Sequence, residues 1–115
     1  MTTYDVEYKQ EDVDTSGVVL SDSNGVLDLT DKTVTFVMKD LNTGEIRHEI
    51  SCTLGGWVNG IYHSAAHGGA TVSFTGTETS SSGQYKSEFV VTGTNFKRHI
   101  PSGNNYKSVM IWEKV

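Results

Sequence analysis

Residues 33–40 read TVTFVMKD, and this stretch decides the fold. Val34, Phe36 and Met38 stand at alternate positions, so in an extended chain their side chains lie on the same face. β-branched and aromatic residues also favour the pleated backbone of a sheet. The stretch therefore predicts a β-strand whose apolar face is turned toward a core.

The same two-residue period recurs along the chain, between short turn signals. After a turn at residues 42–44, residues 46–50 alternate again and predict a hairpin with residues 33–40. No segment shows a convincing helical period; the best candidate, residues 63–67, is too short and is flanked by glycine. The other expected strands cover residues 4–8, 18–21, 26–30, 72–74, 85–92, 96–100 and 106–113, with one short strand and a long loop within residues 53–69.

Length and composition agree with this pattern. A chain of 115 residues suits one domain, because two would each be too small to bury a useful core. Serine and threonine supply 26 residues and glycine 12, against one proline, which favours strands and turns. We therefore predict a single all-β domain over residues 1–115, an antiparallel β-sandwich of about eight strands. Residues 1–13 are a possible docking strand or arm.

The composition also excludes several classes of function. A net charge of −5 disfavours nucleic-acid binding, which depends on contacts to phosphate. No apolar run approaches the roughly 20 residues that span a bilayer, and the N-terminus lacks the segments of a secretory signal. We expect no nucleic acid and no membrane as partners, and folding in the cytosol. The one cysteine, Cys52, excludes an internal disulfide and a cysteine-based zinc knuckle.

Charge is unevenly distributed along the chain. Residues 1–31 carry eight acids and one base, whereas residues 32–115 carry six acids and eight bases. This asymmetry could orient the domain against a partner. The simpler interpretation is an acidic edge that faces solvent.

Residues 12–17, DVDTSG, copy the first half of a calcium-binding loop. Such loops place oxygen ligands at alternate positions and a glycine at the sharp bend. The twelfth position, where the closing bidentate glutamate belongs, is Ser23. We therefore interpret the segment as a turn solvated by carboxylates.

Neither the histidines nor the thiol form a recognisable catalytic motif. His63 and His67 have the spacing of a zinc-binding helix, but the general-base glutamate between them is missing. Cys52 stands at a strand end without a local motif, which predicts a buried structural thiol. His48 is expected to be half-buried and His99 exposed. The sequence thus predicts no enzyme, no cofactor and no metal site.

Exposed aromatic residues and an open strand are the candidates for partner contact. Trp57 lies in a glycine-rich segment, where it could stand at a loop tip, and Trp112 lies near the end of the last expected strand. Exposed tryptophans contact proteins or sugars, although packing at the rim of the core is the competing interpretation. The first strand could dock through its free backbone groups or complete its own sheet. The candidate contact residues are Tyr4, Val6, Tyr8, Trp57 and Trp112.

Three segments combine strand and turn signals in a fixed order. In the first, a glycine turn and an Asp-Leu-Thr step lead into the strand at residues 33–40. The second is a long alternating strand that a glycine opens, and the third ends a strand at the single proline. The segments are residues 25–40, residues 83–92 (GQYKSEFVVT) and residues 99–103 (HIPSG), the last followed by Tyr106 and Ile111.

In order and spacing these segments resemble the N-terminal domain of the upper baseplate proteins of phages that infect Gram-positive hosts, over about residues 14–113. The resemblance implies an immunoglobulin-like β-sandwich that anchors an appendage to a phage particle. It implies a non-enzymatic structural protein of the virion, assembled in the host cytoplasm, that docks in several copies onto a larger tail or baseplate protein. The implied partners are other virion proteins and further copies of this chain in a symmetric array.

Two alternatives stay open. Family members continue into a helical linker and a part that carries receptor-binding proteins, whereas this chain stops at Val115, so capsid decoration is an alternative to a place on the tail. A carbohydrate-binding β-sandwich module is the alternative of another class, and it predicts that Trp57 and Tyr62 are exposed on one concave face. A small hydrolase would need a cleft with convergent acids or a histidine pair.

Overall fold

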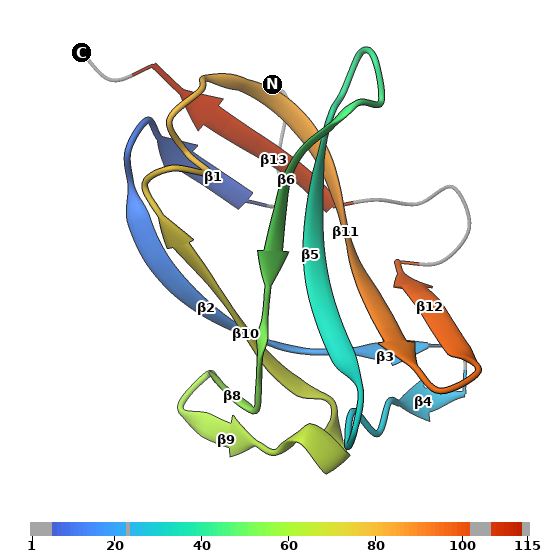
Figure 1. The fold of residues 1–115 in the computed structure, drawn as a ribbon. Coiled ribbons are helices and arrows are strands. Elements are labelled where there is room, and N and C mark those ends of the chain that lie inside the picture. Colours follow the sequence, from blue (N-terminus) through green and yellow to red (C-terminus); the bar gives the residue numbers. More distant parts are fainter. Residues whose placement is uncertain (1–5, 23, 102–106, 114–115) are drawn as a thin grey trace.

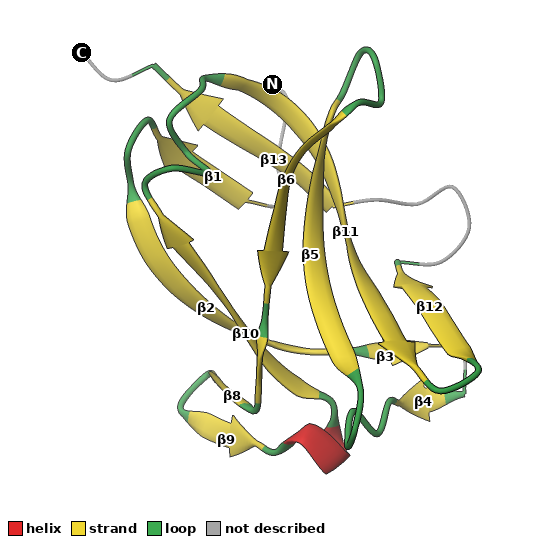
Figure 2. Ribbon diagram, viewed as in Figure 1, coloured by secondary structure: helices red, strands yellow, loops and turns green. Residues whose placement is uncertain are grey.

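The computed structural model describes residues 6–22, 24–101 and 107–113, and these form an all-β protein (Figures 1 and 2). One turn of 3₁₀-helix, η1 (Ala65–His67), interrupts the strands. No helix in the described ranges is long and apolar enough to cross a membrane. Eight of the described strands have four residues or more, in agreement with the expected number. The strands are β1 (Val6–Lys9), β2 (Val13–Val19), β3 (Ser21–Asp22), β4 (Gly25–Val26), β5 (Thr33–Asp40), β6 (Ile46–Ser51), β7 (Thr53–Leu54), β8 (Gly56–Val58), β9 (Ile61–His63), β10 (Gly69–Thr75), β11 (Gly83–Gly93), β12 (Phe96–Ile100) and β13 (Lys107–Trp112).

Strand β11 organises the larger sheet, whose order is β1-β13-β11-β5-β6. It is 11 residues long and pairs along one side first with β13 and then with β12, while β5 lies along its other side. These pairs are antiparallel, but β1 pairs with β13 in parallel. The expectation of an entirely antiparallel fold is therefore wrong at this edge, because no hairpin links β1 to β13 and constrains their direction.

The smaller sheet has the order β2-β10-β7 and is antiparallel. It lies across the core from the larger sheet, and the two layers are consistent with a β-sandwich (Figure 1). Two short hairpins, β3–β4 and β8–β9, lie in the lower part of the molecule in the view of Figure 1, on opposite sides of it.

The core lies between the two sheets and contains the side chains that the alternation predicted. The Phe36 ring of β5 meets the Phe74 ring of β10 edge-on, with centroids 5.9 Å apart, and lies 4.8 Å from the Phe89 ring of β11. Burying such a side chain stabilises the fold by roughly 1.5–3 kcal/mol. The buried apolar residues are Leu20, Leu29, Val34, Phe36, Met38, Ala70, Val72, Phe74, Tyr85, Phe89, Val91, Val109 and Ile111, together with Val37 on the outer side of β5.

Four segments differ from the sequence prediction. Of the strand expected at residues 26–30, only Val26 lies in a strand, the short β4. Strand β2 begins at Val13 rather than at residue 18, because its residues pair with β10 despite their polar composition. Residues 53–69, expected as one short strand and a long loop, contain β7, β8, β9 and η1. In the final strand, Met110 and Trp112 alternate with Val109 and Ile111, a pattern that predicts cover on both faces; in the structure only Val109 and Ile111 are fully buried, and Trp112 is 46 % exposed.

Candidate functional site: an exposed aromatic hairpin

Strands β8 and β9 form a hairpin with a two-residue turn, and this hairpin carries the most exposed aromatic residues of the described chain. Its turn consists of Asn59 and Gly60, which have φ values of 51° and 80°. Two successive positive φ values are typical of the type I′ turn, which asparagine followed by glycine favours. The Asn-Gly pair between two apolar residues was a sequence signal for this hairpin, and the interpretation of the segment as a loop missed it.

Glycines let the hairpin lie backbone to backbone on the outer face of the smaller sheet. A Cβ atom at Gly17 of β2 would collide with the Trp57 carbonyl, and one at Gly69 of β10 would collide with the His63 carbonyl. On the hairpin itself, a Cβ at Gly56 would meet the Ala70 carbonyl. Only glycine permits so close an approach of two backbones. The hairpin is therefore a third layer, held close to the sheet beneath it.

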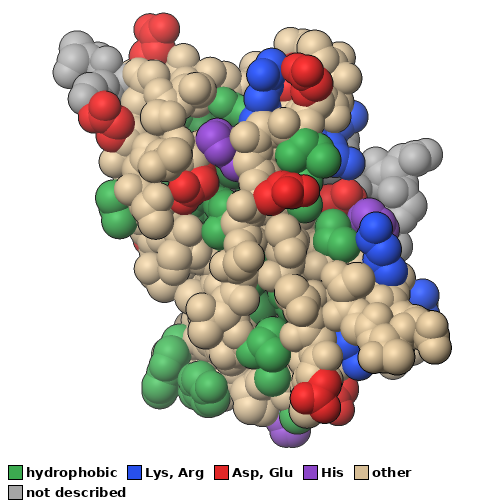
Figure 3. Space-filling view, in the orientation of Figure 1, with side chains coloured by type: hydrophobic (Ala, Val, Ile, Leu, Met, Phe, Trp, Pro, Cys, Tyr) green, Lys and Arg blue, Asp and Glu red, His purple; other side chains and the backbone are tan. Residues whose placement is uncertain are grey.

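Trp57 and Tyr62 are paired across the hairpin and lie on the side that faces away from the sheet. Their side chains are 66 % and 54 % exposed, and their ring centroids are 5.4 Å apart with an interplanar angle of 61°. Ile61, at the tip, is 63 % exposed. Figure 3 shows apolar side chains gathered at this end of the molecule. Exposed apolar clusters of this kind mark binding surfaces.

The other expected contact residues lie elsewhere. Tyr4 is outside the described residues, and of Val6 only the backbone is described, paired with Val109 of β13. Trp112 is partly exposed and its indole N–H donates to a carboxylate oxygen of Glu7 at 3.2 Å. Strand β1 thus adds to its own sheet, which is the simpler of the two readings that its sequence left open.

Tyr8 faces the core rather than solvent. Its ring centroid lies 4.9 Å from that of Phe74, and its hydroxyl donates to an Asp14 carboxylate oxygen at 2.8 Å. Burial first, and then the bond to Asp14, raise the pKa of the Tyr8 hydroxyl well above its usual range. The side chain thereby joins β1 of the larger sheet to β2 of the smaller one.

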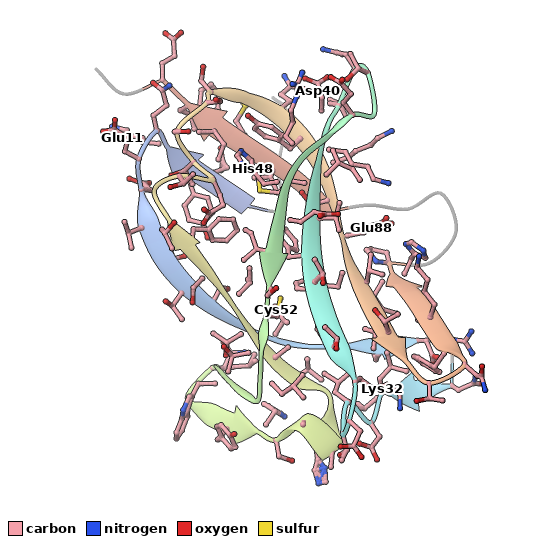
Figure 4. The ribbon with its side chains drawn as sticks, viewed as in Figure 1. Glu11, Lys32, Asp40, His48, Cys52 and Glu88 are labelled. Carbon is pink, nitrogen blue, oxygen red and sulfur yellow. The ribbon has the colours of Figure 1, made fainter. Side chains whose placement is uncertain are left out.

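A shallow polar groove of about 280 Å³ crosses the outer face of the larger sheet. Val37, Ile46 and Val90 contribute its apolar lining. Glu88, labelled in Figure 4, accepts hydrogen bonds from the Lys39 ammonium at 3.4 Å and from the His99 ring at 3.0 Å. The charges of Lys39 and Glu88 therefore compensate one another within the protein.

A second hollow, of about 360 Å³, lies between the β5–β6 turn and the loop before β11. Backbone N–H groups of Thr43 and Asn42 donate to the Asp40 carboxylate and lower its pKa. The Arg47 guanidinium lies 3.7 Å from the same carboxylate. The Tyr85 hydroxyl donates to the backbone carbonyl of the preceding loop. These polar groups therefore stabilise the turns that carry them.

The candidate metal and nucleophile residues are dispersed. Asp12 accepts the backbone N–H of Lys9, while Asp14 lies within β2, so the calcium-like string forms a turn and a strand rather than one loop. His63 and His67 lie on β9 and η1. Among the described residues, no three His, Cys, Asp or Glu side chains are grouped so that they could hold a metal ion.

Cys52 is half-buried between β6 and β7, near the middle of the view in Figure 4. Its burial raises the pKa of the thiol to about 11. A thiol with so high a pKa is a weak nucleophile at neutral pH, because the thiolate is the reactive form. The structure agrees with the expectation of a structural thiol, although Cys52 is less completely buried than expected.

Comparison with known proteins identified no relative: no family model, no curated protein and no solved structure matches this chain.

Proposed function

We propose that the protein is a non-enzymatic structural component of a bacteriophage particle, which docks in several copies onto a larger tail, baseplate or capsid protein. The observation that carries the proposal is the placement of the three segments that resemble the baseplate family. The first leads into β5, the second is β11, and the third covers the end of β12 and continues into β13. In the larger sheet β11 pairs with β5, β12 and β13, which are the other strands of these segments. The resemblance thus corresponds to one contiguous structural unit, which we take to be an immunoglobulin-like domain.

The edge formed by β1 and β2 is the docking surface that this proposal favours. Both strands end the order of their sheets, and the Tyr8–Asp14 hydrogen bond joins them on one side of the molecule. The Leu20 N–H donates to the carbonyl of Gly68, the residue before β10. Along an antiparallel pair, the backbone groups of successive residues point alternately toward and away from the partner strand. Thr15 lies an odd number of residues from Leu20, so its N–H and C=O point away from β10. Residues 1–31, which include both strands, carry eight acids and one base. An extended, basic segment of a larger protein would add to this edge through backbone hydrogen bonds.

Imaging of the intact particle at side-chain resolution tests the proposal directly. We expect this domain in several symmetry-related copies, with β1 or β2 against its neighbour. A position on the tail or baseplate distinguishes the first form of the proposal from capsid decoration. Absence of the chain from purified particles, measured by mass spectrometry, would overturn both forms.

A pair of variants tests the edge. Thr15→Pro removes the outward N–H, and proline is tolerated on an edge strand. Thr15→Val keeps that N–H and serves as the matched control. We expect Thr15→Pro to reduce incorporation into particles at least tenfold while Thr15→Val assembles normally. Equal incorporation of both folded variants would show that β2 is not the docking strand.

A further inference from the structure

The exposed hairpin belongs to a long uncharged part of the chain. Residues 50–77 contain no aspartate, glutamate, lysine or arginine, although such residues make up 20 % of the whole sequence. This stretch includes β7, β8, β9 and β10. A partner at the hairpin therefore meets a surface that offers stacking and hydrogen bonds without formal charge.

A row of hydroxyl groups extends from the hairpin across the outer face of the smaller sheet. On β10 the inward positions hold the core residues Ala70, Val72 and Phe74, so Ser73 and its partner Thr15 on β2 lie on the outer face. Thr71 has the same orientation, but its hydroxyl donates to the Gly55 carbonyl at 2.8 Å and so fastens the hairpin to the sheet. The Thr15 and Ser73 hydroxyls are 3.4 Å apart. Carboxylate oxygens of Glu78 bond to Thr75, at the end of β10 farthest from the hairpin. Asn59, exposed in the turn, adds an amide donor and acceptor beside the aromatic rings.

The exposed area of the two aromatic rings matches the contact area of a small ligand rather than that of a protein interface. Aromatic side chains have roughly 150–250 Å² of surface each. With Trp57 66 % and Tyr62 54 % exposed, the pair offers roughly 200–300 Å². A stable protein interface covers about 800 Å² of each partner. Because the backbone of the hairpin lies against Gly17 and Gly69, the two rings are presented with little freedom to reorganise.

We infer that the Trp57–Tyr62 pair and the adjoining hydroxyl groups form a binding site for a neutral oligosaccharide. The C–H faces of a sugar ring stack on aromatic rings, and its hydroxyls exchange hydrogen bonds with serine, threonine and asparagine. The interplanar angle of 61° suits two successive sugar units that are rotated relative to one another. This inference rests on the hairpin and not on the proposed virion function, so either can fail without the other.

The probe is an array of uncharged oligosaccharides of glucose, galactose, mannose and N-acetylglucosamine, with sulfated and sialylated glycans as the anionic comparison, and each bound glycan is then titrated calorimetrically. We expect binding of at least one of them, and at least a tenfold loss of affinity in Trp57→Ala and in Tyr62→Ala. Trp112→Ala removes a partly exposed tryptophan from another strand and should bind like the unchanged protein. Because the site is uncharged, raising the salt concentration from 0.05 to about 0.5 M should change the affinity less than twofold.

Three results would overturn the inference. The first is that no neutral glycan on the array binds. The second is that only anionic glycans bind and that salt abolishes their binding. The third is that folded Trp57→Ala and Tyr62→Ala both bind with unchanged affinity, with the fold verified by circular dichroism. Continued incorporation into particles in any of these cases would leave the proposed virion function intact.

Discussion

At the scale of single residues, Ser87 has surroundings that do not suit its side chain. It is 1 % exposed on the core face of β11, and within the described residues its hydroxyl has no hydrogen-bond partner. A buried hydroxyl without a partner costs about 1–3 kcal/mol relative to water. We therefore expect Ser87→Ala to leave the free energy of unfolding unchanged or to raise it by up to about 1 kcal/mol. Urea denaturation measures the change.

Ser73→Ala, on the exposed face of β10, is the matched control and should change stability by less than about 0.5 kcal/mol. A loss of more than about 1 kcal/mol in Ser87→Ala would contradict the prediction. It would mean that a buried water molecule satisfies the hydroxyl.

Cys52 gives a second prediction at this scale. The pKa of its thiol is raised from 9.0 to about 11 by burial. Two pKa units lower the thiolate fraction about a hundredfold at pH 8. We expect an aromatic disulfide reagent to modify Cys52 of the folded protein at least about a hundredfold more slowly than Cys52 of the protein in urea. Modification at the same rate in both states would show that the thiol is exposed.

At the scale of elements, Gly17 determines where the β8–β9 hairpin lies. Any side chain there meets the Trp57 backbone, so the hairpin must move. We expect Gly17→Val to lower the free energy of unfolding by about 1–3 kcal/mol, as overpacking does. It should also shift the emission of Trp57. Thr15→Val, on the same face of β2, places a valine where a side chain of the same shape already stands and should be nearly neutral. Equal effects of the two substitutions would falsify this role of Gly17.

The glycine contacts explain which elements the sequence could predict. Strands β5 and β11 were predicted almost residue by residue, because the alternation of apolar and polar residues is visible in the local sequence and runs through the whole of each long strand. Strand β2 was half missed, since an aspartate, a threonine, a serine and a glycine concealed its pairing with β10. The position of the hairpin was not predictable because it depends on Gly17 of β2, which lies 40 positions before Trp57 in the sequence and contacts its backbone.

The candidate site was only partly predictable for the same reason. Trp57 was selected as a contact residue and is exposed, but Tyr8 was selected with it and packs on Phe74. An aromatic residue in an alternating strand has the same sequence pattern whether it faces the core or a partner. The choice between these positions depends on the opposing sheet, which local periodicity does not encode.

At the scale of the whole molecule, the titration of several groups sets the pH range of stability. Burial raises the pKa values of Tyr8, Tyr85 and Cys52. Above about pH 9 the unfolded chain loses these protons before the folded chain does, so the free energy of unfolding falls as pH rises. Hydrogen bonds lower the pKa values of Asp28 and Asp40, so stability also falls below about pH 4, by a small amount because both are exposed.

Thermal melts between pH 2 and 11 measure this dependence. Tyr8→Phe should flatten the decline above pH 9, because the variant lacks the phenol whose pKa is shifted most. A melting temperature that stays constant up to pH 11 in the unchanged protein would contradict the prediction.

The parallel pair of β1 and β13 has a consequence for how the protein is made. These strands are joined in space but lie about 100 residues apart in sequence. Contacts between such distant segments form slowly and only after the intervening chain is available. During synthesis, residues 107–112 must leave the ribosome before β1 has its partner strand. Protease digestion of stalled nascent chains should therefore cut residues 6–9 until translation has passed β13.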